Sequence, residues 1–237
     1  MKQERLHKII ASTQLMSRRK AEEAITAGRV TLNGVVVMTL GTLADSSVDE
    51  IKVDGIKLKF VKKKTIIAFH KPPQVIVSKG DPQGRKTVYE FLPQDLKVNP
   101  VGRLDYDSEG LLLLTDDGEL ANRLMHPSFG VKKIYEVEVK GVPTEGTLNR
   151  LLNGVPLEDG RGKFLGVRIM KKKRDSNSVL KITVDEGRNR FIRRMLKAVD
   201  HRVIRLKRVA IGSIQLGDLE VGCHRELSTE EKKYLSK

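Results

Sequence analysis

Four consecutive leucines at residues 111–114 constrain the fold of this chain more than any other feature. A strand with one face in water alternates apolar and polar residues, so this unbroken run predicts a strand that is buried on both faces. A charged, glycine-bounded loop precedes the run and holds Asp105. We expect partly dry surroundings for this carboxylate, which are costly unless a positive group pairs with it.

The charge of the chain favours a polyanionic partner, with nucleic acid first. The chain has 237 residues, 39% of them hydrophobic, and a formal net charge of +15. This length suits one sizeable domain, or a small domain joined to a larger one. Residues 161–210 hold 17 basic and 4 acidic side chains and are predicted to form the main polyanion-binding surface. A merely solvated face is the alternative for such a charge run.

Several classes of protein are excluded by what the sequence lacks. It has no run of 18 or more apolar residues and no apolar signal core, so we expect neither a membrane protein nor export, but a cytoplasmic protein. The single cysteine, Cys223, rules out an internal disulfide and a thiolate metal site, and we interpret it as a small, partly buried residue. Phosphate-loop, Gly-x-Ser-x-Gly and His/Cys metal motifs are missing, which leaves carboxylate chemistry.

The first 60 residues predict two helices followed by hairpins. Ser17 is a plausible N-cap of the second helix, and Gly28 ends it. An Asn-Gly pair at 33–34 and an Asp-Gly pair at 54–55 predict the hairpin turns.

The first turn of the second helix carries three cations, Arg18, Arg19 and Lys20. The helix dipole disfavours cations there by roughly 0.3 to 1 kcal/mol each in exposed settings. A docked phosphate would use both the free N–H groups and these side chains, so we predict RNA contacts here. Three solvated side chains are the alternative.

From residue 65 the pattern predicts a mixed, mainly antiparallel sheet with flanking helices. Residues 65–78 predict two strands broken by a Pro-Pro pair. In the strand predicted at 132–141, Tyr135, Val137 and Val139 face inward, and a plain core tyrosine is the alternative to a functional one. The remaining predictions are helices at 87–92, 117–125, 144–153 and 188–199, a strand at 179–184, closure of the sheet by 203–214 and a terminal helix within 224–237.

The helix predicted after Gly187 has one apolar face and one basic face. The basic face is formed by Arg190, Arg193, Arg194 and Lys197. No acid occurs from Arg188 to Val199, so this face repels itself unless anions neutralise it. It is predicted to be either a groove wall for phosphates or a source of counterions for buried carboxylates.

Two sets of motifs resemble known families. Residues 5–10, 17–21, 28–34 and 53–55 resemble the RNA-binding domain named after small-subunit ribosomal protein S-four. Residues 102–115 (GRLDYDSEGLLLLT), 133–135 (KIY) and 186–195 (EGRNRFIRRM) resemble, in the same order, the signature motifs of ribosomal RNA pseudouridine synthases of the RsuA family. Together they imply an α+β chain with an RNA-binding domain at 1–62 and a catalytic domain at 65–237.

The second resemblance also implies residue roles. Asp105 would be the catalytic aspartate, Arg103 would take the place of the flipped uridine in the base stack, and Tyr135 would pack against the target base. Arg193 would be the cation paired with Asp105, and Ile182 would line the pocket. Phe191 stands where a polar residue is usual, so no polar RNA contact is expected there. Further RNA contacts are assigned to Arg188, Arg190, Arg194 and Lys197.

The implied activity is the isomerisation of one uridine of ribosomal RNA during ribosome biogenesis, with large-subunit RNA favoured over small-subunit RNA. Uracil is detached, rotated and rejoined through carbon, so we expect neither a cofactor nor a metal. The base must be flipped out of its stack, and Asp105 must be ionised to act as nucleophile or base. The implied partner is ribosomal RNA or a subunit precursor, bound by a monomer. The alternatives are a noncatalytic ribosome-assembly factor, in which the Asp105–Arg193 pair is structural, and a carboxylate-dependent hydrolase.

Overall fold

The computed structural model describes residues 3–60, 64–173 and 176–235. The chain divides into two compact units, Met1–Thr65 with Asp116–Gly118, and Ile66–Thr115 with Glu119–Lys237. The division predicted between residues 62 and 65 falls partly on residues 61–63, which lie outside the described residues.

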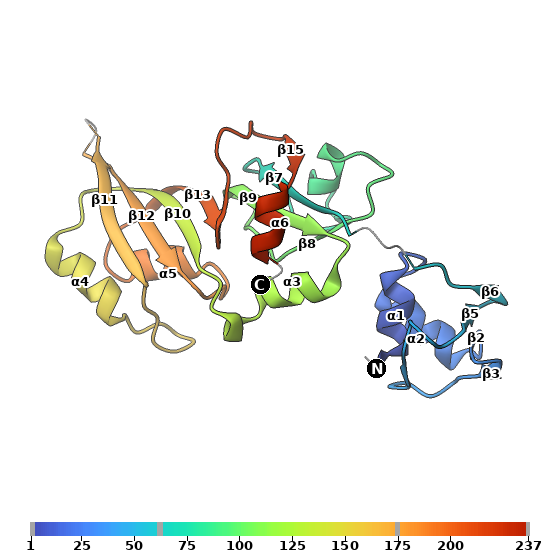
Figure 1. The fold of residues 1–237 in the computed structure, drawn as a ribbon. Helices are drawn as coiled ribbons and strands as arrows, with labels where there is room; N and C mark the ends of the chain where they lie inside the picture. The colour runs from blue at the N-terminus through green and yellow to red at the C-terminus, as the bar shows by residue number, and fades with distance from the viewer. Residues whose placement is uncertain (1–2, 61–63, 174–175, 236–237) are drawn as a thin grey trace. The chain divides into compact units, whose positions relative to one another are not determined.

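In the first unit, two helices pack on short strands, as the sequence predicted (Figure 1). Ser17 caps α2, because its hydroxyl accepts a hydrogen bond from the Lys20 backbone N–H at 3.3 Å. The core joins residues such as Ile10 and Ile25 of the helices to Val30 and Val53 of the sheet. The elements are β1 (Glu4–Arg5), α1 (Leu6–Ser12), α2 (Arg18–Thr26), β2 (Val30–Leu32), β3 (Val35–Val36), β4 (Leu43–Ala44), β5 (Ile51–Val53) and β6 (Ile56–Lys57), with sheets β1-β4 and β3-β2-β5-β6.

The second unit is built on a mixed sheet, which confirms the predicted α+β class. Among the described residues, nine strands form this sheet in the order β11-β12-β10-β13-β9-β7-β15, with β8 beside β9 and β14 beside β13. Its strands pair antiparallel except for β9 and β13, which run parallel. The strands are β7 (Ile66–Lys71), β8 (Asn99–Pro100), β9 (Glu109–Thr115), β10 (Lys133–Val139), β11 (Gly166–Lys172), β12 (Ser178–Val184), β13 (Val203–Ile211), β14 (Ile214–Gln215) and β15 (His224–Glu226).

The strand that contains the four leucines, β9, is buried along its whole length, as predicted. Leu111 and Leu113 pack into one hydrophobic cluster, whereas Leu112 and Leu114 pack into another. Successive side chains of a strand point to opposite faces, so each face of the sheet is covered here. This double burial explains why no polar residue interrupts the run.

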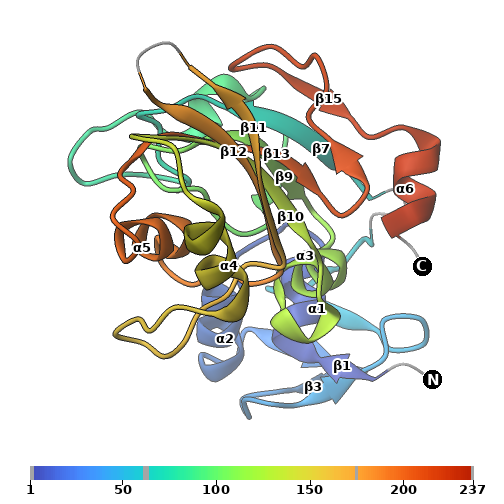
Figure 2. The same cartoon turned by 90° about the vertical axis from the view of Figure 1, so that its left-hand side faces the viewer.

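Helices α4 and α5 cover the same face of β10 and β12 (Figure 2). Leu180, Ile182 and Val184 of β12 are buried there, together with Ile192 and Met195 of α5. The helical elements of this unit are η1 (Val88–Phe91), α3 (Gly118–Met125), η2 (Pro127–Phe129), α4 (Glu145–Asn153), α5 (Phe191–Lys197) and α6 (Thr229–Leu235), where η denotes a 3-10 helix.

Two sequence expectations were wrong. The second strand predicted within 65–78 is reduced to an isolated bridge between Ile76 and Thr87, because the chain turns at Pro73 and Gln74. Cys223 is exposed rather than partly buried, since it lies in the turn before β15. Among the described residues, no helix has the length and apolar content needed to cross a membrane.

Candidate active site

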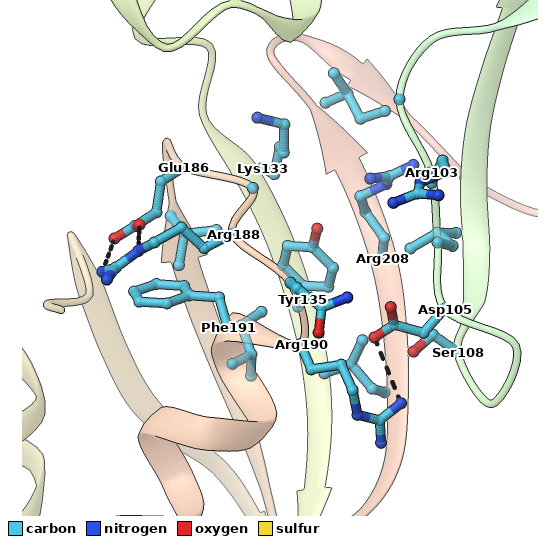
Figure 3. A pocket seen from close by; sticks show the side chains of 18 of the residues that line it. Arg103, Asp105, Ser108, Lys133, Tyr135, Glu186, Arg188, Arg190, Phe191 and Arg208 are labelled. Carbon is cyan, nitrogen blue, oxygen red and sulfur yellow. Dashed lines mark hydrogen bonds and ion pairs between the residues drawn. The ribbon is translucent and has the colours of Figure 1, made fainter. Parts of the chain in front are cut away.

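A cavity of about 530 Å³ opens in the second unit. Such a volume is within the usual range of small-molecule sites. It is lined by the loop before β9, the start of β10, the loop between β12 and α5, and β13 (Figure 3). The sequence-predicted residues that line it are Arg103, Asp105, Tyr135, Arg188, Arg190 and Arg193.

Lys71 holds in place the loop that carries Asp105. This lysine is fully buried at the end of β7. Its ammonium donates to the carbonyl oxygen of Ser108 at 2.8 Å and lies 3.5 Å from that of Tyr106. Burial lowers the pKa of Lys71 to about 8, although the charges of Asp105, Asp107 and Glu109 act in the opposite direction. Lys71 could not be assigned to the site from the sequence, because no local pattern relates it to a loop more than 30 residues away.

The cation in contact with Asp105 is Arg190, not the predicted Arg193. The Arg190 Nη1 atom lies 3.9 Å from Oδ2 of Asp105, whose side chain is 32% exposed. Arg193 instead donates to the main-chain oxygen of Asp107 at 3.1 Å and lies 3.2 Å from its Oδ2. Asp107 occupies the same turn as Asp105 and presents both a carbonyl and a carboxylate, so it takes up the Arg193 guanidinium.

Asp107 also binds Arg190 with both carboxylate oxygens, at 3.2 and 3.0 Å. Partial burial raises the pKa of Asp107, but the Arg190 hydrogen bonds and the charges of Arg193 and Arg190 outweigh it and lower that pKa. Asp107 is therefore an ionised carboxylate that binds two arginines. It was not among the residues predicted from the sequence.

Tyr135 has its ring in the cavity wall and is only 8% exposed, as the alternation of β10 predicted. The predicted pocket residue Ile182 lies opposite Tyr135 on β12, but it is fully buried and does not line the cavity. Val184 lines it instead, because it lies two residues further along the same face of β12, toward the loop that borders the cavity.

Arg208 is a buried arginine in the cavity wall, and it was also missed. It lies opposite Tyr135 on β13 and is 3% exposed. Its Nε donates to the main-chain oxygen of Leu111 at 2.7 Å, while Nη2 has no hydrogen-bond partner among the described residues. Arg208 shares the inward face of its strand with Leu206 and Ala210, a register that could have drawn attention to it.

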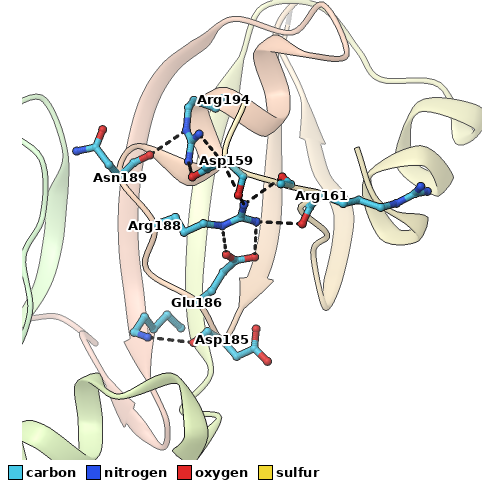
Figure 4. A network of polar contacts seen from close by, with 9 residues as sticks. Asp159, Arg161, Asp185, Glu186, Arg188, Asn189 and Arg194 are labelled. Carbon is cyan, nitrogen blue, oxygen red and sulfur yellow. Dashed lines mark hydrogen bonds and ion pairs between the residues drawn. The ribbon is translucent and has the colours of Figure 1, made fainter. Parts of the chain in front are cut away.

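Arg188 and Arg194, predicted to contact RNA, are engaged within the protein (Figure 4). Arg194 donates to both carboxylate oxygens of Asp159 at 2.7 Å, and this bidentate contact lowers the pKa of Asp159 to about 2. Arg188 pairs with Glu186 and Asp159, and its guanidinium lies 4.7 Å from the Phe191 ring centre.

The basic face of α5 is thus neutralised largely by acids outside the helix. Of the two roles predicted for this face, the arrangement favours counterions for carboxylates of the protein over a groove wall for phosphates, at Arg188, Arg190, Arg193 and Arg194. Lys197 is exposed, as are Arg18, Arg19 and Lys20 in the first unit. Among the residues that the structure describes, no cluster of three or more His, Cys, Asp or Glu side chains is arranged to hold a metal ion.

Comparison with known proteins identifies the family of this chain. Residues 65–198 match the family described as RNA pseudouridylate synthase, and residues 4–46 match the S4 domain. The chain belongs to the RNA pseudouridylate synthase family, whose members isomerise uridine to pseudouridine.

Individual relatives agree with this assignment over the whole chain. The ribosomal large subunit pseudouridine synthase B of Bacillus subtilis (strain 168) is 43% identical over 236 residues, which cover 98% of this chain and 95% of that protein. An RNA pseudouridine synthase of Aquifex aeolicus (strain VF5) is 44% identical over 240 residues, which cover 100% and 95%. A crystal structure of a pseudouridylate synthase matches with a TM-score of 0.68 at 30% identity, over 98% of this chain and 99% of that one.

These findings confirm the prediction of an enzyme with an N-terminal S-four-type domain. They favour it over the noncatalytic alternative.

Proposed function

We propose that this enzyme converts one specific uridine of large-subunit ribosomal RNA to pseudouridine during ribosome biogenesis. The observation that carries the proposal is the position of Asp105, at a cavity of about 530 Å³ and 3.9 Å from the Arg190 guanidinium. The choice of RNA is supported by the large-subunit relative, which shares 43% of its residues with this chain.

In this mechanism the target nucleotide leaves its stack and enters the cavity. Unstacking costs about a few kcal/mol, which phosphate contacts and stacking on an aromatic ring offset. Tyr135 supplies the ring, and Arg103, exposed at the rim, takes the vacated place in the RNA. Asp105 then acts as nucleophile or base, beside the positive charge of Arg190. Arg193 supports this field from its position on Asp107.

The two parts of the chain divide the work. We assign RNA binding to residues 1–62, through the exposed Arg18, Arg19 and Lys20, and catalysis to residues 65–237. Lys197 is a further phosphate contact, because it is exposed on α5.

The partner is ribosomal RNA or a precursor of the ribosomal subunit, which places the reaction in the cytoplasm. We propose that the enzyme acts as a monomer. It needs no cofactor, because the isomerisation is redox-neutral and takes no group from a donor.

The proposal is tested by mapping pseudouridines in both ribosomal RNAs from cells with and without the protein. We expect one large-subunit uridine to lose its modification, and the wild-type gene but not the Asp105→Asn variant to restore it. Unchanged modification of both RNAs would contradict the proposal and would favour the alternative, a noncatalytic ribosome-assembly factor. Cleaved rather than isomerised nucleoside in a purified reaction would instead identify a hydrolase.

A further inference from the structure

Two carboxylates in the loop before β9 lie near the same arginine. Arg190 donates to Asp107 at 3.0 and 3.2 Å, distances typical of a hydrogen-bonded ion pair. Its distance to Asp105 is 3.9 Å, too long for a hydrogen bond. Asp107 also receives Arg193, at its main-chain oxygen and at Oδ2. Both Arg190 and Arg193 are therefore held by the neighbour of Asp105.

The backbone at Arg190 is consistent with this restraint. Arg190 precedes α5 with a φ of 48°, in the left-handed region that residues other than glycine rarely adopt. Such a conformation persists where surrounding contacts over-determine it. The bidentate bond to Asp107 is such a contact, because it fixes the Arg190 guanidinium.

The distance between Arg190 and Asp105 matters for the chemistry. A close bidentate pair with a cation occupies the oxygen lone pairs that a carboxylate must use as nucleophile or base. Lys71 and Arg208 are two further cations close to this loop, and the charges of Asp105, Asp107, Glu109 and Arg208 all act on Lys71. Of these, Lys71 donates to main-chain oxygens and Arg208 donates its Nε to Leu111, so neither is bonded to Asp105.

We propose that Asp107 is a positioning residue that holds Arg190 and Arg193 beside Asp105 but too far away to occupy its oxygens. This inference rests on the proposed function for its effect on turnover. Its structural part, the restraint on Arg190, is independent of the substrate.

The kinetic test compares Asp107→Asn and Asp107→Glu with a matched control, Glu231→Gln, which breaks a bidentate pair with Arg225 outside the cavity. We expect Asp107→Asn to lower kcat by about 10- to 100-fold, the effect of misplacing a catalytic environment by about 1 Å, with little change in KM. Asp107→Glu restores most of kcat, because it keeps a carboxylate for Arg190. The control keeps the wild-type kcat. Melting temperatures confirm that each variant is folded.

The double variant separates positioning from simple charge loss. In the wild type, Arg190→Gln lowers kcat, because Asp105 loses its nearest cation. In the Asp107→Asn background the same change has a smaller effect or raises kcat, because it removes the arginine that has moved onto Asp105. Equal effects of Arg190→Gln on kcat in both backgrounds would overturn the proposal. A change in KM alone in Asp107→Asn would also overturn it, and would assign Asp107 to RNA binding.

A structural readout keeps the inference testable if the wild type forms no pseudouridine, a result that would contradict only the proposed function. Crystal structures of the wild type and Asp107→Asn are compared at one pH. We expect Arg190 to close on Asp105 to about 2.7 to 2.9 Å in the variant, as in a charge-assisted hydrogen bond. An Arg190 that keeps its wild-type distance from Asp105 would overturn the positioning role.

Discussion

Gly110 packs directly on the backbone of Arg208, where β9 runs parallel to β13. A Cβ atom at residue 110 would lie 2.7 Å from the Arg208 nitrogen and closer still to its main-chain oxygen. The contact joins the strand that follows the Asp105 loop to the strand that carries Arg208, so it fixes two walls of the cavity against each other.

This contact predicts a large cost for Gly110→Ala. The φ of 105° is already unfavourable for alanine, and the added methyl group meets backbone, which cannot move aside. We expect a loss of about 3 kcal/mol or more in the free energy of unfolding, measured by urea denaturation. Gly160→Ala is the control, because Gly160 has a φ of 101° with nothing within 4 Å of the added Cβ. Equal losses in the two variants would show that the close packing has no energetic effect.

Lys71 predicts a pH-dependent stability. Burial lowers its pKa from 10.5 to about 8, so between these values the unfolded chain binds more protons than the folded one. The unfolding free energy contributed by Lys71 therefore rises with pH across this window, by at most about 1.4 kcal/mol per pH unit. Compared with Lys71→Met, the wild type should gain stability from about pH 8 to 10.5, and the difference should be constant below pH 8. A difference that does not change with pH in that window would contradict the assignment.

The basic start of α2 predicts salt-dependent RNA binding. Each phosphate contact contributes roughly 0.7 to 0.9 to the slope of log K against log salt concentration. Replacing Arg18, Arg19 and Lys20 by glutamine should lower that slope by up to about 2 to 3 and weaken binding, with kcat unchanged at saturating RNA. Lys57→Gln serves as the control, because Lys57 is already paired with Glu50 at 3.0 Å. An unchanged slope in the triple variant would mean that these side chains are only solvated.

Much of the framework could be predicted from the sequence, because it depends on local periodicity. The leucine run of β9, the inward face of β10 with Tyr135 and the Ser17 cap follow from the spacing of side chains along one element. The Gly-Arg-Leu-Asp motif likewise indicated Asp105, which the structure brings to the cavity.

The details that were wrong or missed depend on contacts between distant segments. Helical spacing alone cannot distinguish Arg190 from Arg193 as the partner of Asp105, since the left-handed turn at Arg190 sets which guanidinium approaches. Asp159, which neutralises Arg194, lies 35 residues away in a loop. Lys71 and Arg208 reach the site only because β7 and β13 flank β9 in the sheet.

The most direct test of the account is a single-turnover assay of purified Asp105→Asn on an RNA fragment that contains the target uridine, with RNA affinity measured alongside. The account predicts no pseudouridine, together with an affinity equal to or tighter than that of the wild type, because loss of a carboxylate reduces repulsion of phosphates. Appreciable pseudouridine formation by Asp105→Asn would contradict it.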